Sequence, residues 1–296
     1  MRFGVCLPNY GNDVTSEGLR KFAGEAETLG YDSVWCSDHI LIGSRSGTPY
    51  ERITESVTSL SFVAASTTKV KLGISALIIA MRDPVTVAKQ LATVDYLSGG
   101  RLAVAVGTGW AEREFRNVGA DFHQRGRVVD ESIRLLRSMW NGKPDFKGKR
   151  TGVDIKDAVL EPRPVQQRLP IWVAGNSEFA MRRAARLGDA WHPNVFEPGA
   201  FGASVKRFRA IPGGEKKDIC VRIAVDTGSG ASTYVSPQGE KRLILSGDFE
   251  KTRTTLDGLE RMGVSCAVLA PNHDGRSSVE GQLLTIRDFA KEFVRR

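Results

Sequence analysis

The sequence predicts an α/β protein, a (β/α)8 TIM barrel with insertions in the βα loops. Three observations lead to this prediction: short β-rich runs alternate with amphipathic helical segments, eight such units follow one another, and 296 residues suffice for one large core. A doubly wound parallel sheet is the competing architecture, because it uses the same units. We expect one domain over residues 1–296.

The first half of the chain shows the alternation clearly. Phe22, Ala26 and Leu29 recur at helical spacing. Pro84 suits the first turn of a later helix, which the Ser-Gly-Gly run at 98–100 ends. The predicted strands cover 2–7, 31–36, 70–79 and 101–106, and the predicted helices cover 15–29, 54–66, 84–96 and 121–140.

Two long segments interrupt this alternation. Residues 43–52 form a polar loop rich in Gly, Ser and Arg, which is too long for a simple connection and is therefore a candidate lid. Residues 141–169, with their Gly, Lys and Pro, are predicted to be an insertion. Beyond it, predicted strands cover 171–174, 189–191, 219–225 and 264–269, and predicted helices cover 178–187, 249–261 and 279–294.

Composition limits the classes of partner. The net charge is +8, but the basic residues are scattered and lack the interleaved aromatics of a nucleic-acid platform. No segment approaches about 18 uninterrupted apolar residues, which excludes a membrane span, and the first apolar run is too short for a signal peptide. We therefore expect a cytoplasmic protein.

The cysteines predict no disulfide or metal site, because they are far apart in short apolar runs: Cys6, Cys36, Cys220 and Cys266.

Polar residues gather where the predicted strands end. Asp38 and His39 directly follow the second strand. Active sites of barrels lie at the carboxyl ends of the strands, so we expect both side chains in the mouth of the barrel. Polar, glycine or aromatic residues also lie at the ends of other predicted strands, at residues 8–10, 75–77, 107–110 and 175–177 and at His192. This mouth is rich in glycine and aromatic residues, which suits a flat cofactor with a phosphate better than a hydrolytic or metal site.

Three long motifs resemble the luciferase-like monooxygenase superfamily. The first starts at Met81 and reads MRDPVTVAKQLATVDYLSGGRLAVAVGTGW; the second ends at Trp191 and reads LEPRPVQQRLPIWVAGNSEFAMRRAARLGDAW. With YDSVWCSDHI, which starts at Tyr31, the chain is most similar to the coenzyme F420-dependent oxidoreductases. The resemblance covers nearly the whole chain and is weakest over 195–247. It implies a single luciferase-like barrel domain.

The resemblance also implies roles for individual residues. In deazaflavin relatives an Asp-His pair contacts the cofactor ring, which here falls on Asp38 and His39. His39 would be catalytic, close to the hydride-transferring carbon, since imidazole titrates near neutral pH. Two alternatives stay open: a neighbouring carboxylate satisfies His39 without a role in turnover, or Asp38 only orients its loop.

A cis peptide bond supports the ring in such relatives, and the matching bond here joins Ser75 and Ala76. A regular buried strand is the alternative. Gly107 and Gly109 would leave space over the ring. Read alone as a dinucleotide motif, this G-x-G is weak, because the third glycine of that motif is absent.

The resemblance places the cofactor phosphate at the turn that Ala174, Gly175, Asn176 and Ser177 form. Glycine allows close approach of the backbone, and N–H groups at a helix N-terminus attract an anion. An ordinary helix cap is the alternative. Some relatives add a lysine after the sixth strand, which is absent here, so an arginine such as Arg163 is a candidate partner of the phosphate.

Trp110 and Asn9 are predicted to line the substrate pocket. Trp110 stands where sugar-phosphate dehydrogenase relatives carry a catalytic glutamate, which argues against sugar-phosphate oxidation and favours a hydrophobic or planar substrate. A tryptophan of the core is the alternative.

The resemblance implies an F420-dependent oxidoreductase that exchanges hydride between the deazaflavin C5 and a small organic substrate. The alternatives are an FMN-dependent monooxygenase that uses O2 and a cofactor-binding protein without turnover. The positive charge suits the phosphodiester and oligoglutamate tail of coenzyme F420, or serves solubility. A homodimer is expected from the habit of the family.

Overall fold

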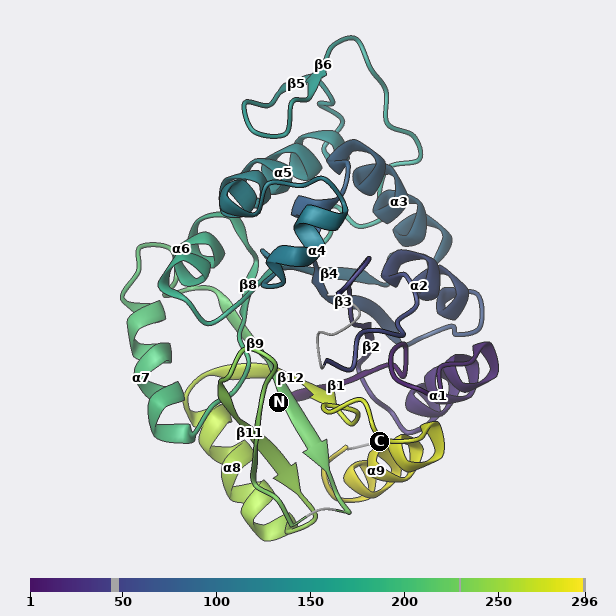
Figure 1. Cartoon of the computed structure of the whole chain (residues 1–296), viewed down its shortest axis with the longest axis vertical. Helices are drawn as coiled ribbons and strands as arrows, with labels where there is room; N and C mark the ends of the chain where they lie inside the picture. Colours follow the sequence, from purple (N-terminus) through teal and green to yellow (C-terminus); the bar gives the residue numbers. More distant parts are fainter. Residues whose placement is uncertain (44–47, 229, 295–296) are drawn as a thin grey trace.

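The computed structural model describes residues 1–43, 48–228 and 230–294, and parallel strands close into a barrel at its centre (Figure 1). Pairing of β8 with β9 and of β12 with β1 completes the closure, which excludes a doubly wound sheet. Eight strands of the described chain form the barrel: β1 (Arg2–Cys6), β2 (Ser33–Cys36), β3 (Lys71–Leu77), β4 (Leu102–Val106), β7 (Ile171–Ala174), β8 (Ala190–His192), β9 (Asp218–Asp226) and β12 (Val264–Ala270). The predicted fold class is confirmed.

Helices surround the barrel (Figure 1). Thr15 caps the first of them by accepting the amide of Gly18, and Asp83 with Pro84 begins the third. The helices that follow barrel strands are α1 (Ser16–Thr28), α2 (Ser56–Ala64), α3 (Pro84–Leu97), α5 (Arg125–Trp140), α6 (Glu178–Leu187), α7 (Pro198–Arg209), α8 (Phe249–Arg261) and α9 (Val279–Phe293). Shorter helices are η1 (Ile79–Met81), α4 (Glu112–Asn117) and η2 (Phe122–Gln124).

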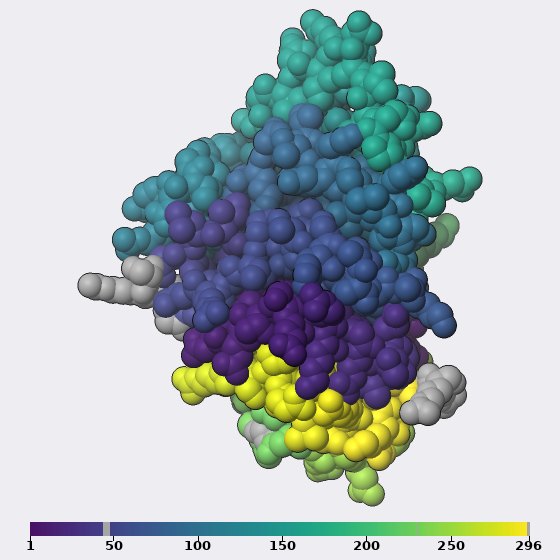
Figure 2. All heavy atoms as spheres, turned by 90° about the vertical axis from the view of Figure 1, so that its right-hand side faces the viewer, coloured from purple at the N-terminus to yellow at the C-terminus, as the bar shows by residue number. Residues whose placement is uncertain are grey.

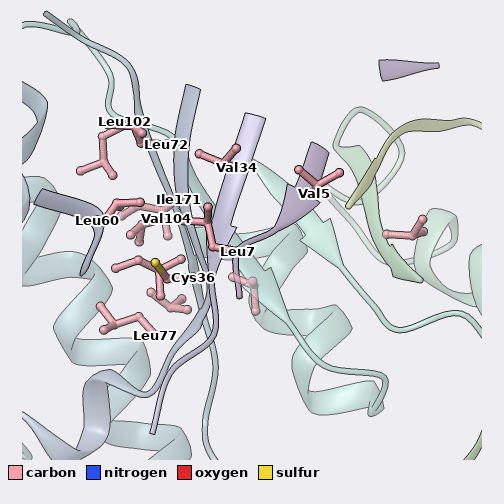
Figure 3. Close-up of a cluster of buried hydrophobic side chains, with 14 of the residues drawn as sticks. Val5, Leu7, Val34, Cys36, Leu60, Leu72, Leu77, Leu102, Val104 and Ile171 are labelled. Carbon is pink, nitrogen blue, oxygen red and sulfur yellow. The ribbon is translucent and has the colours of Figure 1, made fainter. Parts of the chain in front are cut away.

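The main hydrophobic core lies between the strands and the helices. Leu60 of α2, Leu72 of β3 and Val104 of β4 are fully buried members of it (Figure 3). Burying one such side chain contributes about 1.5–3 kcal/mol. Helices α1 and α9 lie side by side (Figures 1 and 2), where Lys21 forms an ion pair with Glu280 at 2.8 Å. The two ends of the described chain are thereby held together.

A tryptophan fills the inside of the barrel. The indole of Trp35 lies 4.5 Å from the ring of Trp172, measured between ring centroids, and its Nε1 donates to Ser33 Oγ at 2.9 Å. Gly73 on β3 faces this indole so closely that an added Cβ would lie 2.2 Å from Trp35 Cε3, and one added at Gly4 would lie 2.8 Å from Nε1. Glycine is therefore required beside the indole, which occupies the inside of the barrel.

Two segments lie outside this regular pattern. The insertion at 141–169 carries a small antiparallel hairpin of β5 (Phe146–Lys147) and β6 (Asp154–Ile155), which projects from the barrel (Figures 1 and 2). A second hairpin, of β10 (Thr233–Val235) and β11 (Lys241–Ser246), joins the carboxyl end of β9 in parallel. The sequence did not predict this second hairpin, nor helix α7.

The part of the chain that the structure describes contains no helix long and apolar enough to cross a membrane. Its four cysteines are buried and free, as their apolar surroundings in the sequence predicted.

Replacing Gly73 by alanine tests how tightly Trp35 fills the barrel. The close approach of the new Cβ predicts that Gly73→Ala lowers the free energy of unfolding by about 1–3 kcal/mol. Gly24→Ala in α1 is the matched control, because nothing lies within 4 Å of its added Cβ, and it should raise that free energy by about 0.5–1 kcal/mol. Denaturant unfolding of both variants measures the difference. Two variants of equal stability would contradict the packing argument.

Candidate functional site

A cavity of about 340 Å³ opens where the barrel strands end. This volume lies in the range of small-molecule sites, about 300–1,000 Å³. Among its lining residues are most of those predicted from the sequence: Asp38, His39, Ser75, Ala76, Gly107, Gly109, Trp110, Ala174, Gly175, Asn176 and Ser177. Of the predicted lid at 43–52, residues 44–47 lie outside the described residues, and Tyr50 in the described part lines the cavity.

The carboxylate of Asp38 holds neighbouring loops together. It accepts hydrogen bonds from both terminal nitrogens of Arg82, at 2.7 and 2.9 Å, from the hydroxyl of Ser56 at 2.8 Å and from the backbone amide of Ile78 at 2.8 Å. Its side chain is 0% exposed. These bonds engage both oxygens, so the carboxylate orients the loops after β2 and β3, one of the two roles expected for it. Contact between Asp38 and a cofactor stays a prediction.

His39 is paired with a buried glutamate from α4. Nδ1 of His39 lies 2.7 Å from Glu114 Oε2, while Oε1 accepts the amides of Ile40 and Leu41 at 2.6 and 3.2 Å. Burial alone would raise the pKa of Glu114, but the hydrogen bonds from His39 and these amides outweigh it and lower that pKa. An ionised carboxylate only accepts, so Nδ1 carries the proton.

The other ring nitrogen of His39, Nε2, is therefore the one available to a ligand. The side chain lines the cavity, and within the described residues Nε2 has no hydrogen-bond partner in the protein. The ring of Tyr50 lies 4.6 Å from the imidazole, tilted by 31°, and Trp110 meets the imidazole edge-on at 5.7 Å. The arrangement presents one fixed imidazole nitrogen beside an aromatic wall, which can accept or donate a proton at a ligand oxygen.

Small residues form one side of the cavity. The peptide bond between Ser75 and Ala76 is cis, as the resemblance implied. A Cβ added to Gly107 would lie 3.3 Å from the Cβ of Ala76 and 4.0 Å from that of Ala174. Gly109 has a φ of +74°, and a Cβ there would meet Phe115 at 2.7 Å. The result is a smooth surface of methyl groups and backbone, which suits a flat ring.

Ser75 is held by a neutral histidine. Nδ1 of His192 donates to the carbonyl of Cys220, because a carbonyl can only accept, so Nε2 accepts the hydroxyl of Ser75 at 2.7 Å. Burial lowers the pKa of His192 to about 4. The imidazole also lies parallel to Trp35 at 5.9 Å, on top of the aromatic filling of the barrel.

The expected phosphate turn stands at the start of α6. Gly175 has a φ of +120°, Ser177 caps the helix by accepting the amide of Ala180, and Asn176 accepts the amide of Asn194 at 3.0 Å. The expected helix cap is present and these residues also line the cavity, while phosphate binding at this turn stays a prediction. Arg163 does not reach this turn: it forms an ion pair with Glu161 at 3.2 Å and does not line the cavity.

The placement of Asn9 corrects the sequence prediction. Asn9 is 0% exposed and is absent from the described lining of the cavity. Its amide donates to Ser37 O at 2.9 Å and to Thr54 O at 3.3 Å, and its oxygen accepts the amide of Ser37 at 2.9 Å. Asn9 therefore joins the ends of β1 and β2 behind the wall, because neighbouring backbone groups claim its polar atoms.

Several residues of the site were not found from the sequence. No local motif marks these residues, since their partners lie far away along the chain. The acidic residues of the short helix α4 were the one signal in the sequence for a carboxylate that could pair with His39. The residues that were not found are Tyr50, Glu114, Arg222, Tyr234 and Arg242.

The luciferase-like monooxygenase family model matches residues 1–265. An F420-dependent glucose-6-phosphate dehydrogenase from Amycolatopsis mediterranei (strain U-32) is 33% identical over 180 residues, 58% of this chain and 52% of the relative. An FMNH(2)-dependent dimethylsulfone monooxygenase from Pseudomonas putida is 32% identical over 195 residues, 64% of this chain and 52% of the relative. The chain thus spans about half the length of these curated relatives.

Solved structures share the fold at lower identity. A monooxygenase, RslO1 from Streptomyces bottropensis, has a TM-score of 0.79 at 19% identity, with 99% of each chain covered. An F420-dependent secondary alcohol dehydrogenase in complex with an F420-acetone adduct has a TM-score of 0.77 at 18% identity, with 100% of this chain and 99% of that chain covered. Deazaflavin and flavin enzymes thus both occur among the relatives.

The neutral state of His192 predicts a loss of stability in acid. The unfolded chain binds the proton near pH 6.5, whereas the folded chain binds it only near pH 4. The free energy of unfolding therefore falls as the pH drops from 6.5 to 4, by about 3 kcal/mol from this residue, with no contribution above that range. His192→Gln, which keeps a neutral donor and acceptor, should lack this part of the loss. Urea unfolding at both pH values compares the proteins, and parallel losses would refute a neutral His192.

Proposed function

We propose that this chain, which belongs to the luciferase-like monooxygenase family, is an oxidoreductase that binds coenzyme F420 and acts on a small organic substrate. A bound deazaflavin would supply or accept a hydride at its C5 position. The substrate then gains or loses a proton at the oxygen of an alcohol or carbonyl group. The chain's own residues must bind both molecules and move that proton.

The observation that carries the proposal is the pairing of His39 with Glu114. The carboxylate keeps a proton on Nδ1, so Nε2 is the ring nitrogen that is left to exchange a proton with a ligand in the cavity. Such a nitrogen can take the proton of an alcohol during dehydrogenation or, once protonated, give it to a carbonyl oxygen during reduction. Glu114 would also stabilise the imidazolium that forms, since the two groups are in contact in a buried site.

The cavity fits a flat cofactor with a phosphate. Ala76, Gly107 and Ala174 present only small groups, and side chains at Gly107 would fill the space above them. The turn at Gly175 and Ser177 offers backbone N–H groups at the start of α6, where an anion is favoured. These residues would hold the ring and the phosphate, respectively.

An FMN-dependent monooxygenase is the second candidate. It is supported by the flavin-dependent relatives and by the aromatic wall of Tyr50 and Trp110, which suits an apolar substrate. The small residues Ala76, Gly107 and Ala174, together with the turn at Gly175 and Ser177, would also accept FMN. We favour the deazaflavin because a fixed proton-transfer group is what alcohol or carbonyl chemistry requires.

Cofactor choice is tested by titrating the purified protein with coenzyme F420 and with FMN, at low and at high salt, and following the fluorescence of each cofactor. We expect tighter binding of coenzyme F420, weakened by salt because its tail is anionic. A preference for FMN would overturn the deazaflavin and make oxygenation the leading reaction. Tight binding of coenzyme F420 with no turnover of any alcohol or ketone in a screening panel would favour a binding protein without catalysis.

The role of His39 is tested with His39→Gln. We expect turnover of an alcohol or ketone that the wild-type protein accepts to fall by about 10²–10⁴-fold, with the dissociation constant of the cofactor changed by less than about threefold. His123→Gln is the matched control, since His123 is exposed on η2 and lies outside the described lining of the cavity. Unchanged turnover in His39→Gln would remove this residue from the mechanism.

A further inference from the structure

A positively charged side chain lies at the bottom of the cavity. On β9, Cys220 belongs to the cluster inside the barrel, whereas Val221 belongs to the outer core, so alternation turns Arg222 inward. Its Nη1 donates to Ser75 O at 2.6 Å and its Nη2 donates to Ser37 Oγ at 3.1 Å. These two bonds hold the guanidinium between the ends of β2 and β3.

No carboxylate within the described residues forms an ion pair with Arg222. Two other arginines of low exposure are paired with carboxylates: Arg82 with Asp38 and Arg183 with Asp130. An enclosed charge without a partner is costly. The remaining N–H groups of Arg222 have no acceptor in the described protein, and the residue lines the cavity.

The surroundings of Arg222 connect it to the reactive histidine. Arg222, His39 and Tyr50 all line the cavity, and the ring of Tyr50 lies 4.6 Å from the imidazole of His39, with the two planes tilted by 31°. A ligand held by Arg222 therefore lies in the same cavity as His39, which Trp110 and Tyr234 also line.

We propose that Arg222 binds a carboxylate, or an equivalent planar oxyanion, of the organic substrate. The planar guanidinium matches a carboxylate with directed hydrogen bonds, and the aromatic walls accommodate an apolar or aromatic body. The substrate class is thus a small aromatic or hydrophobic acid. That the ligand is the substrate rests on the proposed function, whereas the anion site itself does not.

The cofactor phosphate is the other source of an anion. The turn at Gly175 and Ser177 lies on the opposite side of β8 from β9, at the start of α6, and has its own N–H donors. Arg222 is held by Ser37 and Ser75 instead. The guanidinium is thus held at the ends of β2 and β3 and not at the start of α6, and the experiment separates the two sources.

The test is calorimetric titration of the protein without cofactor, with three probes: benzoate, its neutral analogue benzamide and inorganic phosphate. Wild-type protein should bind benzoate about tenfold or more tightly than benzamide. Arg222→Met should abolish this preference while leaving benzamide binding unchanged. Arg242→Met is the matched control, because Arg242 also lines the cavity but is already bonded to Glu240 at 2.6 Å; it should keep the preference.

Other results would overturn the proposal. They are equal binding of benzoate and benzamide by the wild-type protein, a preference that survives in Arg222→Met, or a loss confined to phosphate, which would assign Arg222 to the cofactor. Should Arg222→Met not fold, Arg222→Lys replaces it, and benzoate binding should weaken by about tenfold because lysine lacks the planar fork. No cofactor enters these titrations, so failure of the F420 proposal leaves their outcome unaffected.

Discussion

The site depends on the indole of Trp35 inside the barrel. Gly4 and Gly73 make room for it, and Trp172 and His192 lie against it. The cavity lies beyond this layer, at the carboxyl ends of the strands, and Trp35 is not part of its lining. The same contact buries His192, keeps it neutral and lets its Nε2 accept the hydroxyl of Ser75. Packing inside the barrel therefore keeps the imidazole of His192, at the bottom of the cavity, uncharged.

Two carboxylates, those of Asp38 and Glu114, orient residues around the cavity. Asp38 accepts hydrogen bonds from Arg82 and from the backbone amide of Ile78 after β3, so it connects the chain segments that follow β2 and β3. Glu114 comes from α4, after β4, and fixes the tautomer of His39. The acid beside the histidine in sequence thus bonds to the loops, whereas the acid that pairs with the imidazole is 75 residues away. A buried acid is tolerated in both cases because several donors satisfy it.

The two sides of the cavity differ in character. His39, Tyr50 and Trp110 form an aromatic side, while Arg222 adds a cation from β9. The hairpin of β10 and β11 contributes Tyr234 and Arg242 to the rim. This division suits a ligand with an apolar body and an anionic end.

By itself the sequence determined the eight barrel strands and the placement of polar residues at their ends, because hydrophobic periodicity and turn residues are local signals. The cis bond at Ser75 and the turn at Gly175 followed from resemblance, since nothing local marks a cis bond. Only the tertiary structure decided that Glu114 pairs with His39, that Asn9 lies behind the wall and that Arg222 stands in the cavity without a carboxylate partner in the described chain. Those contacts join residues distant in sequence, and closure of the barrel alone brings them together.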